Sequence, residues 1–592
     1  MCGVAGIINL SGRLDRQRLN DLATRMADRL QYRGPDDAGV WVDPTGYCAF
    51  SHRRLSVVDL SLGGHQPMIH AATGNAITFN GEIYNYQERR AALQGKGHSF
   101  CTASDTEVLL AGLVAEGEKG VDALDGMFAF GYFDAKTKML TLARDAFGEK
   151  PLYYARTADW FAFASELHAL TVLPHFDTAI EISSIATYLA LQYVPAPLSI
   201  YKNANKLPPG HTLTLTPDGK ITIERHFHFS ALSQETSKRS LDDLADELEH
   251  IIGFTVKTRL IADVPLGAFL SGGVDSSTVV AVAMKQLKRP IKTFSIGFTE
   301  GDSEHIEARA VAEHLGAEHY EEILSPEAFD LRYHIPKVLD EPHADSSCMP
   351  TWMVSRFARQ QVTVALSGDG GDELFGGYDR YQRMMRAIDS SHPSAAYEAY
   401  IQLFTVQALE KFIGPLPKDT AERLDRMRAP LDITDKPLLQ RLRENDIENY
   451  LPGAVLAKVD RMSMQHSLEV RAPLLGRAVA DFAARMAADD LCTIDHSKRV
   501  LKQLAARHMP REWLDRPKKG FAIPTTASWG GVKLAAELKT LLTGPECRLA
   551  AWIAPERLGR FIDYHMKTPM IWHMWPIFVL EKWLRSHPGT PA

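Results

Sequence analysis

The hydrophobic pattern changes once along the chain, near residue 230, and this change constrains the fold more than any other feature of the sequence. Before it, short apolar runs of strand length alternate with turn residues. Two segments with helical spacing, 19–30 and 106–116, interrupt these strands. The pattern predicts a layered α/β sandwich for the first part of the chain.

After the change, strand-like runs alternate with helical segments. Ser240 and Asp243 have the spacing of a helix N-cap, and apolar residues then recur at helical intervals up to Leu260. The elements expected next are strands at 267–270, 293–298 and 362–366 and helices that begin near Ser276 and Ser303. This alternation predicts a parallel, doubly wound sheet with helices on both faces, followed beyond Tyr397 by a mostly helical part.

With 592 residues, the chain is several times longer than a usual domain, so two large domains with separate cores are expected. The passage 193–211 is rich in proline, which fixes φ and lacks an N–H donor, so helices and central strands are disfavoured there. We place the domain junction near this passage and assign the hairpin that follows it to the first domain. The expected domains are 1–229 and 240–592.

The composition excludes several classes of protein. A formal net charge of −7 provides no basic field for nucleic acid, so small molecules are the expected ligands. Six cysteines without the spacing of a disulfide scaffold or a zinc site indicate a reducing, cytoplasmic compartment. The sequence has no apolar run of membrane-spanning length and no signal-peptide pattern at its start, so no membrane partner is expected. The apolar segment 571–584 is interrupted by charges and proline and is expected to be a core helix.

Cys2 follows the first methionine, so removal of one residue would place a thiol and a free α-amine on the same residue. A terminal amine has a pKa of about 7.7 to 8.0, so it can accept the thiol proton and serve as the base for its own nucleophile. The alternative is that Cys2 is a small buried residue of the first strand, as free cysteines often are. Gly3 and Gly6 are expected to leave room beside the thiol for backbone and substrate.

Six motifs then occur in order in the first part of the chain. They are YRGPDD (32–37), HRRLSVVD (52–59), FNGEIYN (79–85), SDTE (104–107), LDGMFAF (124–130) and ARDAFGEKPLYY (143–154). With these motifs, almost the whole first domain resembles the class II glutamine amidotransferases. The resemblance implies the αββα sandwich of the Ntn hydrolases and attack of the Cys2 thiol on the amide carbon of glutamine. It also implies that the Asn80 side chain and the Gly81 backbone N–H form the oxyanion hole.

The same resemblance implies how glutamine is held. Arg54 would bind its α-carboxylate in a fork geometry that suits a planar carboxylate. Glu82 and Asp105 would hold its α-ammonium group. The full set of residues implied to bind glutamine is Arg54, Leu55, Ser56, Val57, Val58, Asn80, Gly81, Glu82 and Asp105.

The segment LSGGVDSS (270–277) follows an expected strand and begins an expected helix. Glycines let backbone N–H groups turn inward, serine hydroxyls add donors, and the helix N-terminus adds partial positive charge, so the segment can bind an anion. It lacks the lysine of the usual P-loop, and a Gly-Gly turn before a helix is often only a turn. The segment resembles the pyrophosphate loop of ATP pyrophosphatases, which implies cleavage of ATP between its α- and β-phosphates and transfer of AMP.

Further motifs make the second domain similar to the asparagine synthetase domain over nearly its full length. They are FSIGF (294–298), DEPHADSS (340–347), LSGDGGDELFGGYDRY (366–381), KVDRMSMQHSLEVRAPLL (458–475) and RPKKGF (516–521). The similarity implies an ATP-pyrophosphatase-like fold with a helical C-terminal part. The residues implied to bind ATP are Leu270, Ser271, Gly272, Gly273, Asp275, Ser276, Ile296, Ser367 and Gly368.

The similarity also implies roles for other polar residues. Asp275 and Asp372 would bind Mg²⁺, a hard cation that takes oxygen ligands. Asp369 stands where the best-described asparagine synthetases carry glutamate, so the carboxylate is kept with one methylene less and the acyl acceptor is less certain. Lys518 matches the catalytic lysine of the family, but its neighbour Lys519 leaves the register between the two open.

These resemblances imply a homodimeric, glutamine-hydrolysing asparagine synthetase that uses ATP and Mg²⁺. Aspartate would be activated as β-aspartyl-AMP, and ammonia from glutamine would reach it through an internal tunnel. One alternative keeps the chemistry but acts on another carboxylate, on a cell-surface sugar, a peptide or a secondary metabolite. A second is a lactam-forming synthetase, against which Cys2 argues. A third is a non-catalytic regulatory protein that retains the fold.

Overall fold

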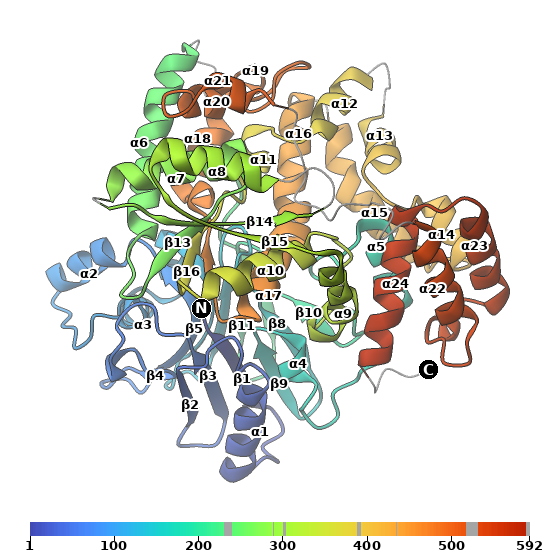
Figure 1. Ribbon diagram of the computed structural model, residues 1–592. Helices are drawn as coiled ribbons and strands as arrows, with labels where there is room; N and C mark the ends of the chain where they lie inside the picture. The colour runs from blue at the N-terminus through green and yellow to red at the C-terminus, as the bar shows by residue number, and fades with distance from the viewer. Residues whose placement is uncertain are drawn as a thin grey trace.

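The computed structural model describes residues 1–229, 239–287, 289–299, 304–387, 392–433, 435–516 and 531–587. Within these ranges the chain forms two sheets of six strands and one of five (Figure 1). The six-stranded sheets are built from residues 3–225 and the five-stranded sheet from 266–471. The domain boundaries expected at 229 and 240 stay a prediction, because residues 230–238 lie outside the described part.

The two six-stranded sheets are antiparallel and pack face to face. In spatial order, the first contains β10 (Ala204–Lys206), β8 (Tyr153–Arg156), β9 (Trp160–Ala164), β1 (Gly3–Asn9), β3 (Cys48–Arg54) and β2 (Asp37–Val42). The second contains β12 (Ile221–Arg225), β11 (His211–Leu215), β7 (Leu140–Arg144), β6 (Gly126–Phe133), β5 (Ala76–Ile83) and β4 (Met68–Ile69). The outer faces are covered by α1 (Arg16–Asp28) on the first sheet and by α2 (Tyr86–Gly95) and α3 (Asp105–Glu116) on the second. This arrangement confirms the expected αββα sandwich.

Strand β1 shows why glycine occurs in the centre of the sandwich. Its successive side chains point alternately into the core between the sheets and into the core under α1. A Cβ atom on Gly6 would lie 2.3 Å from the ring of Phe163, and one on Gly3 would lie 2.6 Å from Cβ of Leu30. The two glycines therefore make room for core side chains, and the expectation that they make room for substrate is wrong.

The third sheet is parallel, and helices cover both of its faces. In spatial order, it contains β15 (Glu318–Leu324), β14 (Lys292–Phe298), β13 (Leu266–Phe269), β16 (Val364–Leu366) and β17 (Glu469–Arg471). Figure 1 shows α7 (Val274–Gln286) and α8 (Glu304–Leu315) on one face and α10 (Cys348–Arg359) and α17 (Ala457–Met464) on the other. The expected doubly wound sheet is confirmed.

The order of the strands predicts where this sheet could bind a ligand. β13 is its first strand in sequence but lies in its centre, with β14 on one side and β16 on the other. The winding direction therefore reverses next to β13. In open α/β sheets, ligands bind at such a reversal, outside the carboxyl ends of the strands.

The rest of the chain is mostly helical, as expected. The remaining helices are α4 (Leu167–Leu170), α5 (Ile182–Leu191), α6 (Leu241–Arg259), α9 (Ile335–Val338), α11 (Gly371–Phe375), α12 (Asp379–Ala387), α13 (Pro393–Tyr400), α14 (Val406–Phe412), α15 (Lys418–Arg428), α16 (Leu438–Asn445), a π-helix (Asp446–Leu456), α18 (Arg477–Arg485), α19 (Ala488–Leu491), α20 (Arg499–Ala505), α21 (Arg511–Leu514), α22 (Gly531–Thr543), α23 (Pro555–Lys567) and α24 (Ile571–Ser586). The hydroxyl of Tyr188 on α5 donates to the carbonyl of Pro576 on α24 at 2.9 Å, so α24 is a core helix, as expected. Among the described residues, no helix combines the length and apolarity needed to cross a bilayer.

A buried network of charges joins the sandwich to the parallel sheet. Arg33, whose side chain is fully buried, donates to both carboxylate oxygens of Asp460 on α17, at 2.8 and 3.0 Å. The same guanidinium donates to Glu166 at 2.5 Å and to the carbonyl of Cys2 at 3.0 Å. A buried guanidinium is costly unless it is paired, so this network fixes how the two parts of the chain pack.

Replacement of Asp460 by alanine is therefore expected to destabilise the protein strongly. Removal of one partner of a buried ion pair costs roughly 3–5 kcal/mol, because the other charge stays buried without it. The matched control is Arg13→Ala, which breaks an ion pair with Asp159 whose arginine side chain is 79% exposed and which should cost no more than about 1 kcal/mol. Thermal and urea unfolding of the two variants checks this, and equal losses of stability would contradict it.

Candidate functional site

The first candidate pocket lies around Cys2, which directly precedes the central strand β1. It contains a cavity of about 30 Å³ lined by Cys2 and by residues of both sandwich sheets. The backbone N–H of Cys2 donates to Oδ1 of Asn80 at 2.7 Å, and its thiol lies 3.9 Å from the carbonyl oxygen of Leu55. Burial raises the pKa of the Cys2 thiol, so the thiol needs a base before it can attack an electrophile.

Asn80 and Gly81 lie together on β5, beside Cys2. Nδ2 of Asn80 is buried and has no hydrogen-bond partner among the described residues. A buried donor without an acceptor costs about 1–3 kcal/mol, so this amide is ready to bind an oxygen that enters the pocket. Gly81 has a φ of +152°, and a Cβ atom there would lie 2.0 Å from the carbonyl oxygen of Met127, so only glycine fits. The pair has the character that an oxyanion hole requires.

Arg54, at the end of β3, holds the loop that follows it against the pocket. Its buried guanidinium donates to three backbone carbonyl groups of the segment 58–61. Gly64 allows this, since a Cβ atom there would lie 1.8 Å from Nη2 of Arg54. Ser56 lies outside the lining of the cavity and donates its backbone N–H to Asp36 at 2.8 Å. The expected glutamine-binding residues of this segment that do line the cavity are Arg54, Leu55, Val57 and Val58.

The opposite wall of the pocket is acidic. Burial raises the pKa of Asp105 to about 6, and burial together with Asp105 raises the pKa of Glu82 well above its ordinary value. Strand β17 of the parallel sheet completes this wall: Glu469 binds the terminal ammonium group of Met1 at 2.5 Å, and Arg471 lies 3.3 Å from the carboxylate of Glu82. Glu469 and Arg471 belong to the site but were not expected there.

The second candidate pocket lies at the carboxyl ends of β13, β14 and β16, where the winding of the sheet reverses. Its volume of about 760 Å³ falls within the range of small-molecule and cofactor sites. All of the residues expected to bind ATP line it, namely Leu270, Ser271, Gly272, Gly273, Asp275, Ser276, Ile296, Ser367 and Gly368.

The loop between β13 and α7 is shaped to receive an anion. Gly272 has a φ of +74°, and a Cβ atom there would lie 2.7 Å from the backbone carbon of Glu307. The loop can therefore lie flat against α8 only with glycine at this position. The hydroxyl groups of Ser271 and Ser276 lie 3.0 Å apart, and α7 begins at Val274. Hydroxyls and a helix N-terminus together favour a phosphate group.

Asp275 and Asp372 converge on one cation in this pocket, which is the ammonium group of Lys498. Burial lowers the pKa of Lys498, but the two carboxylates outweigh burial and raise it above its ordinary value. Among the described residues, no three His, Cys, Asp or Glu side chains are arranged to hold a metal by themselves. Two carboxylates in a phosphate-binding pocket do fit Mg²⁺, which is commonly bound by one or two carboxylates and by substrate phosphates.

Two further groups lie on the side of this pocket that faces the sandwich. Asp369 accepts a hydrogen bond from the hydroxyl of Ser367 at 2.7 Å, and burial raises the pKa of its carboxyl group. Lys458, from the segment that also contributes Asp460, forms an ion pair with Asp345 at 2.9 Å. Asp369, Lys458 and Asp345 all line the cavity, so the acyl acceptor would meet both signs of charge here.

The expected catalytic lysine, Lys518, and its neighbour Lys519 lie outside the described residues. Arg516 is the last described residue before them. It lines the second pocket and forms an ion pair with Glu307 at 3.2 Å.

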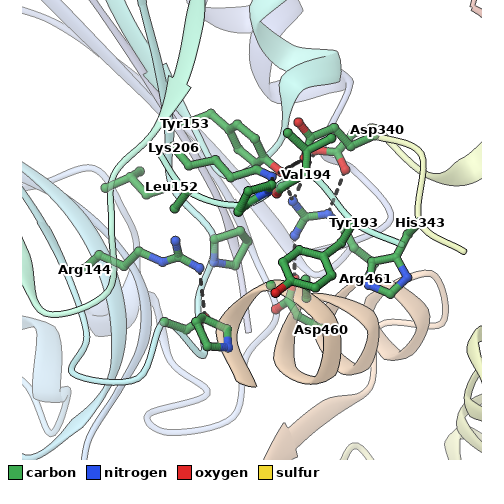
Figure 2. A pocket seen from close by; sticks show the side chains of 18 of the residues that line it. Arg144, Leu152, Tyr153, Tyr193, Val194, Lys206, Asp340, His343, Asp460 and Arg461 are labelled. Carbon is green, nitrogen blue, oxygen red and sulfur yellow. Dashed lines mark hydrogen bonds and ion pairs between the residues drawn. The ribbon is translucent and has the colours of Figure 1, made fainter. Parts of the chain in front are cut away.

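A third cavity, of about 60 Å³, is lined by both parts of the chain. Figure 2 shows the guanidinium of Arg461 in its wall between Asp340 and Asp460, which it contacts at 2.9 and 3.0 Å. In the same wall, Lys206 pairs with Glu341 at 2.5 Å. A water molecule needs roughly 10–15 Å³ of such space, so the cavity can hold several molecules of that size.

Hydrogen bonds connect the wall of the third cavity to both pockets. On one side, Asp460 binds Arg33, which in turn binds the carbonyl of Cys2. On the other side, Nδ1 of His343 accepts the backbone N–H of Asp345 at 3.3 Å, and Asp345 lines the second pocket. Arg33 is thus the one residue between the wall of the cavity and Cys2, whereas His343, in the same wall, contacts a residue of the second pocket directly.

Comparison with known proteins agrees with this geometry. Residues 1–227 match the glutamine amidotransferase domain family, and residues 247–585 match the asparagine synthase family. Asparagine synthetase (glutamine-hydrolyzing) 1 of Bacillus subtilis is 34% identical over 88% of this chain and 87% of the relative. A putative asparagine synthetase (glutamine-hydrolyzing) of Mycobacterium tuberculosis H37Rv is 33% identical over 84% of this chain and 83% of the relative. Asparagine synthetase (glutamine-hydrolyzing) 3 of Bacillus subtilis is 30% identical over 95% of this chain and 93% of the relative.

The matches cover nearly the whole chain, and the resemblance seen in the motifs is confirmed. The chain belongs to the glutamine-hydrolysing asparagine synthetase family.

Proposed function

We propose that the chain converts aspartate, glutamine and ATP into asparagine, glutamate, AMP and pyrophosphate. The observation that carries the proposal is that one chain holds the Cys2 pocket, the large pocket beside Ser271 and, at Arg461, a cavity lined by residues of both parts of the chain. Such an arrangement suits an enzyme that makes a small nucleophile at one site and consumes it at another. Relatives named as glutamine-hydrolyzing asparagine synthetases support the choice of reaction.

Glutamine would be hydrolysed by the thiol of Cys2. Removal of Met1 frees the α-amine of Cys2 at the position where its nitrogen lies 2.7 Å from Oδ1 of Asn80. The amine accepts the thiol proton, and the thiolate attacks the amide carbon of glutamine. The oxyanion that forms accepts hydrogen bonds from Nδ2 of Asn80 and from the backbone of Gly81. Ammonia leaves, and water then cleaves the thioester to release glutamate.

The two ends of glutamine would bind opposite walls of this pocket. The guanidinium of Arg54 would bind its α-carboxylate, and Glu82 and Asp105 would bind its α-ammonium; all three residues line the cavity. Burial raises the pKa of Asp105, and the ammonium group of a bound ligand would stabilise the charged form of this carboxyl group.

The acceptor carboxylate would be activated in the large pocket. The phosphates of ATP would lie on the loop at Ser271, with the adenine beside Ile296. Asp275 and Asp372 would hold Mg²⁺, which supplies positive charge against the phosphates. A carboxylate oxygen of aspartate attacks the α-phosphorus, so that β-aspartyl-AMP forms and pyrophosphate leaves. Ammonia then attacks the acyl carbon and AMP leaves, because AMP is a far better leaving group than an oxide ion.

Ammonia would pass between the sites through the cavity at Arg461. Only neutral ammonia is a nucleophile, and in bulk water near neutral pH most of it is ammonium. Two cations in the wall of the cavity are paired with carboxylates, Arg461 with Asp340 and Asp460 and Lys206 with Glu341. Paired carboxylates offer little attraction to an ammonium ion, so the wall favours passage of the neutral species.

One residue, Asp369, supports an acyl acceptor other than aspartate. Asp369 carries one methylene less than the glutamate expected at its position, which leaves more room beside Ser367 in a cavity that is already large. The alternative function is therefore the same amidation of a different carboxylate.

The proposal is tested by incubation of the purified protein with glutamine, Mg-ATP and either aspartate or a panel of other carboxylic acids. With aspartate, we expect asparagine, AMP and pyrophosphate in equal amounts. Mass spectrometry identifies the amide, and chromatography separates AMP from ADP. An amide made only from another acid would establish the alternative acceptor, whereas ADP in place of AMP would refute the mechanism.

Replacement of Cys2 by alanine should abolish glutamine hydrolysis, by at least about a thousandfold, because the nucleophile is lost. Synthesis with ammonium chloride as the nitrogen source should remain near the level of the unmodified protein. Cys101→Ala removes an exposed thiol and serves as the control, with both activities unchanged. Equal loss of both activities in the Cys2 variant would contradict two separate sites.

Replacement of Lys518 by alanine should abolish synthesis from either nitrogen source and leave glutamine hydrolysis intact, since its charge would stabilise the adenylate and the departing pyrophosphate. Lys519→Ala is the matched control, one residue away in the same segment. Release of pyrophosphate and of glutamate, measured separately, distinguishes the two variants. If only Lys519→Ala loses synthesis, the catalytic role belongs to Lys519.

A further inference from the structure

Lys498 lies inside the large pocket and bridges the two carboxylates proposed to bind Mg²⁺. Its Nζ atom forms ion pairs with Asp275, in the first turn of α7, and with Asp372, in the first turn of α11, the latter at 2.6 Å. The lysine side chain is only 7% exposed, so this contact belongs to the wall of the pocket. The ammonium group thus occupies the place between two carboxylates that a metal ion would take.

The fold keeps the lysine in this place at a cost. Its backbone has a φ of +53°, in the left-handed region that residues with a Cβ atom disfavour. Its side chain also passes directly over Gly377, where a Cβ atom would lie 1.9 Å from Cε of Lys498. A strained backbone and a glycine that clears the path show that the position of the ammonium group is determined by the structure.

Lys498 and a divalent cation must compete for the same oxygens. The ammonium group relieves the repulsion between the carboxylates of Asp275 and Asp372 when no metal is present. A metal ion that arrives alone has to displace this group from both carboxylates. A metal ion that arrives with ATP also brings phosphate oxygens, which give the displaced ammonium group a new partner.

We propose that Lys498 takes the place of the divalent cation in the nucleotide-free protein and moves onto the phosphate oxygens when Mg-ATP enters, an inference that rests on the proposed function. Lys498 is a positioning residue in the empty site and a phosphate ligand in the filled one. As a consequence, the metal binds together with the nucleotide and only weakly without it.

The test compares the unmodified protein with Lys498→Met, which keeps the aliphatic chain and removes the charge. Binding of Mn²⁺ alone is measured by electron paramagnetic resonance. We expect at least about tenfold tighter binding in the variant, since the competing charge is gone. Binding of α,β-methylene-ATP in EDTA is measured by calorimetry. We expect at least about tenfold weaker binding, because a phosphate ligand is lost and the positive charge that Lys498 places beside the two carboxylates is removed.

The matched control is Lys285→Met on the same helix as Asp275. Lys285 pairs with Glu249 at 2.6 Å, and its side chain is 56% exposed, so both affinities should stay unchanged. If Lys498→Met does not fold, Lys498→Gln takes its place with the same two measurements.

The opposite changes of the two affinities distinguish this role from a structural one, which would weaken both. If Mn²⁺ alone binds the Lys498 variants no more tightly than the unmodified protein, or if the nucleotide analogue in EDTA binds equally well, the inference is overturned. If the unmodified protein fails to bind the analogue even with Mn²⁺, the proposed function itself fails, and the two failures are thereby separated.

Discussion

The buried pairing of Arg33 with Asp460 is the interaction on which the rest of the structure depends. It connects the carbonyl of Cys2 to the helix that carries Lys458, so the position of the thiol is tied to the wall of the nucleotide pocket. Such a pair is expensive to desolvate and contributes little net stability, but its geometry permits only one way of packing. Asp460, which this pair holds in place, also lines the third cavity.

The sequence was a good guide to elements with a strong apolar pattern and a poor one to elements that are held by charge. The strands at the centre of the sandwich, the parallel strands next to the nucleotide pocket and the core helix α24 were all expected. Strand β17 was not expected. Glu469 and Arg471 are two of its three residues, and these charged side chains can be buried because they form ion pairs with groups that are distant in the sequence. Helix α2 was also missed, since its sequence is mostly polar and its apolar face is narrow.

The residues of the two candidate pockets also differ in how well the sequence predicted them. The motifs brought together a group of residues that line one pocket, because the loop between β13 and α7 is continuous in the sequence. That they bind ATP stays a prediction. Lys498 lies in none of the motifs. Glu469 and Arg471 lie within the motif 458–475, but the motif does not show that the fold brings them beside the Cys2 pocket. Gly3 and Gly6 were assigned to substrate because the sequence does not show which side chains approach a glycine, and here they belong to the core.

Strand β17 and helix α17 also limit where related chains could recombine to give a hybrid protein. A crossover near residue 235, between the two large parts, would look harmless from the sequence pattern. It would nevertheless separate Arg33 from Asp460, and Glu82 from Arg471. A hybrid that keeps the ancestry of its N-terminal half therefore has to carry the segment 458–475 from the same parent, so these distant stretches are inherited as one unit.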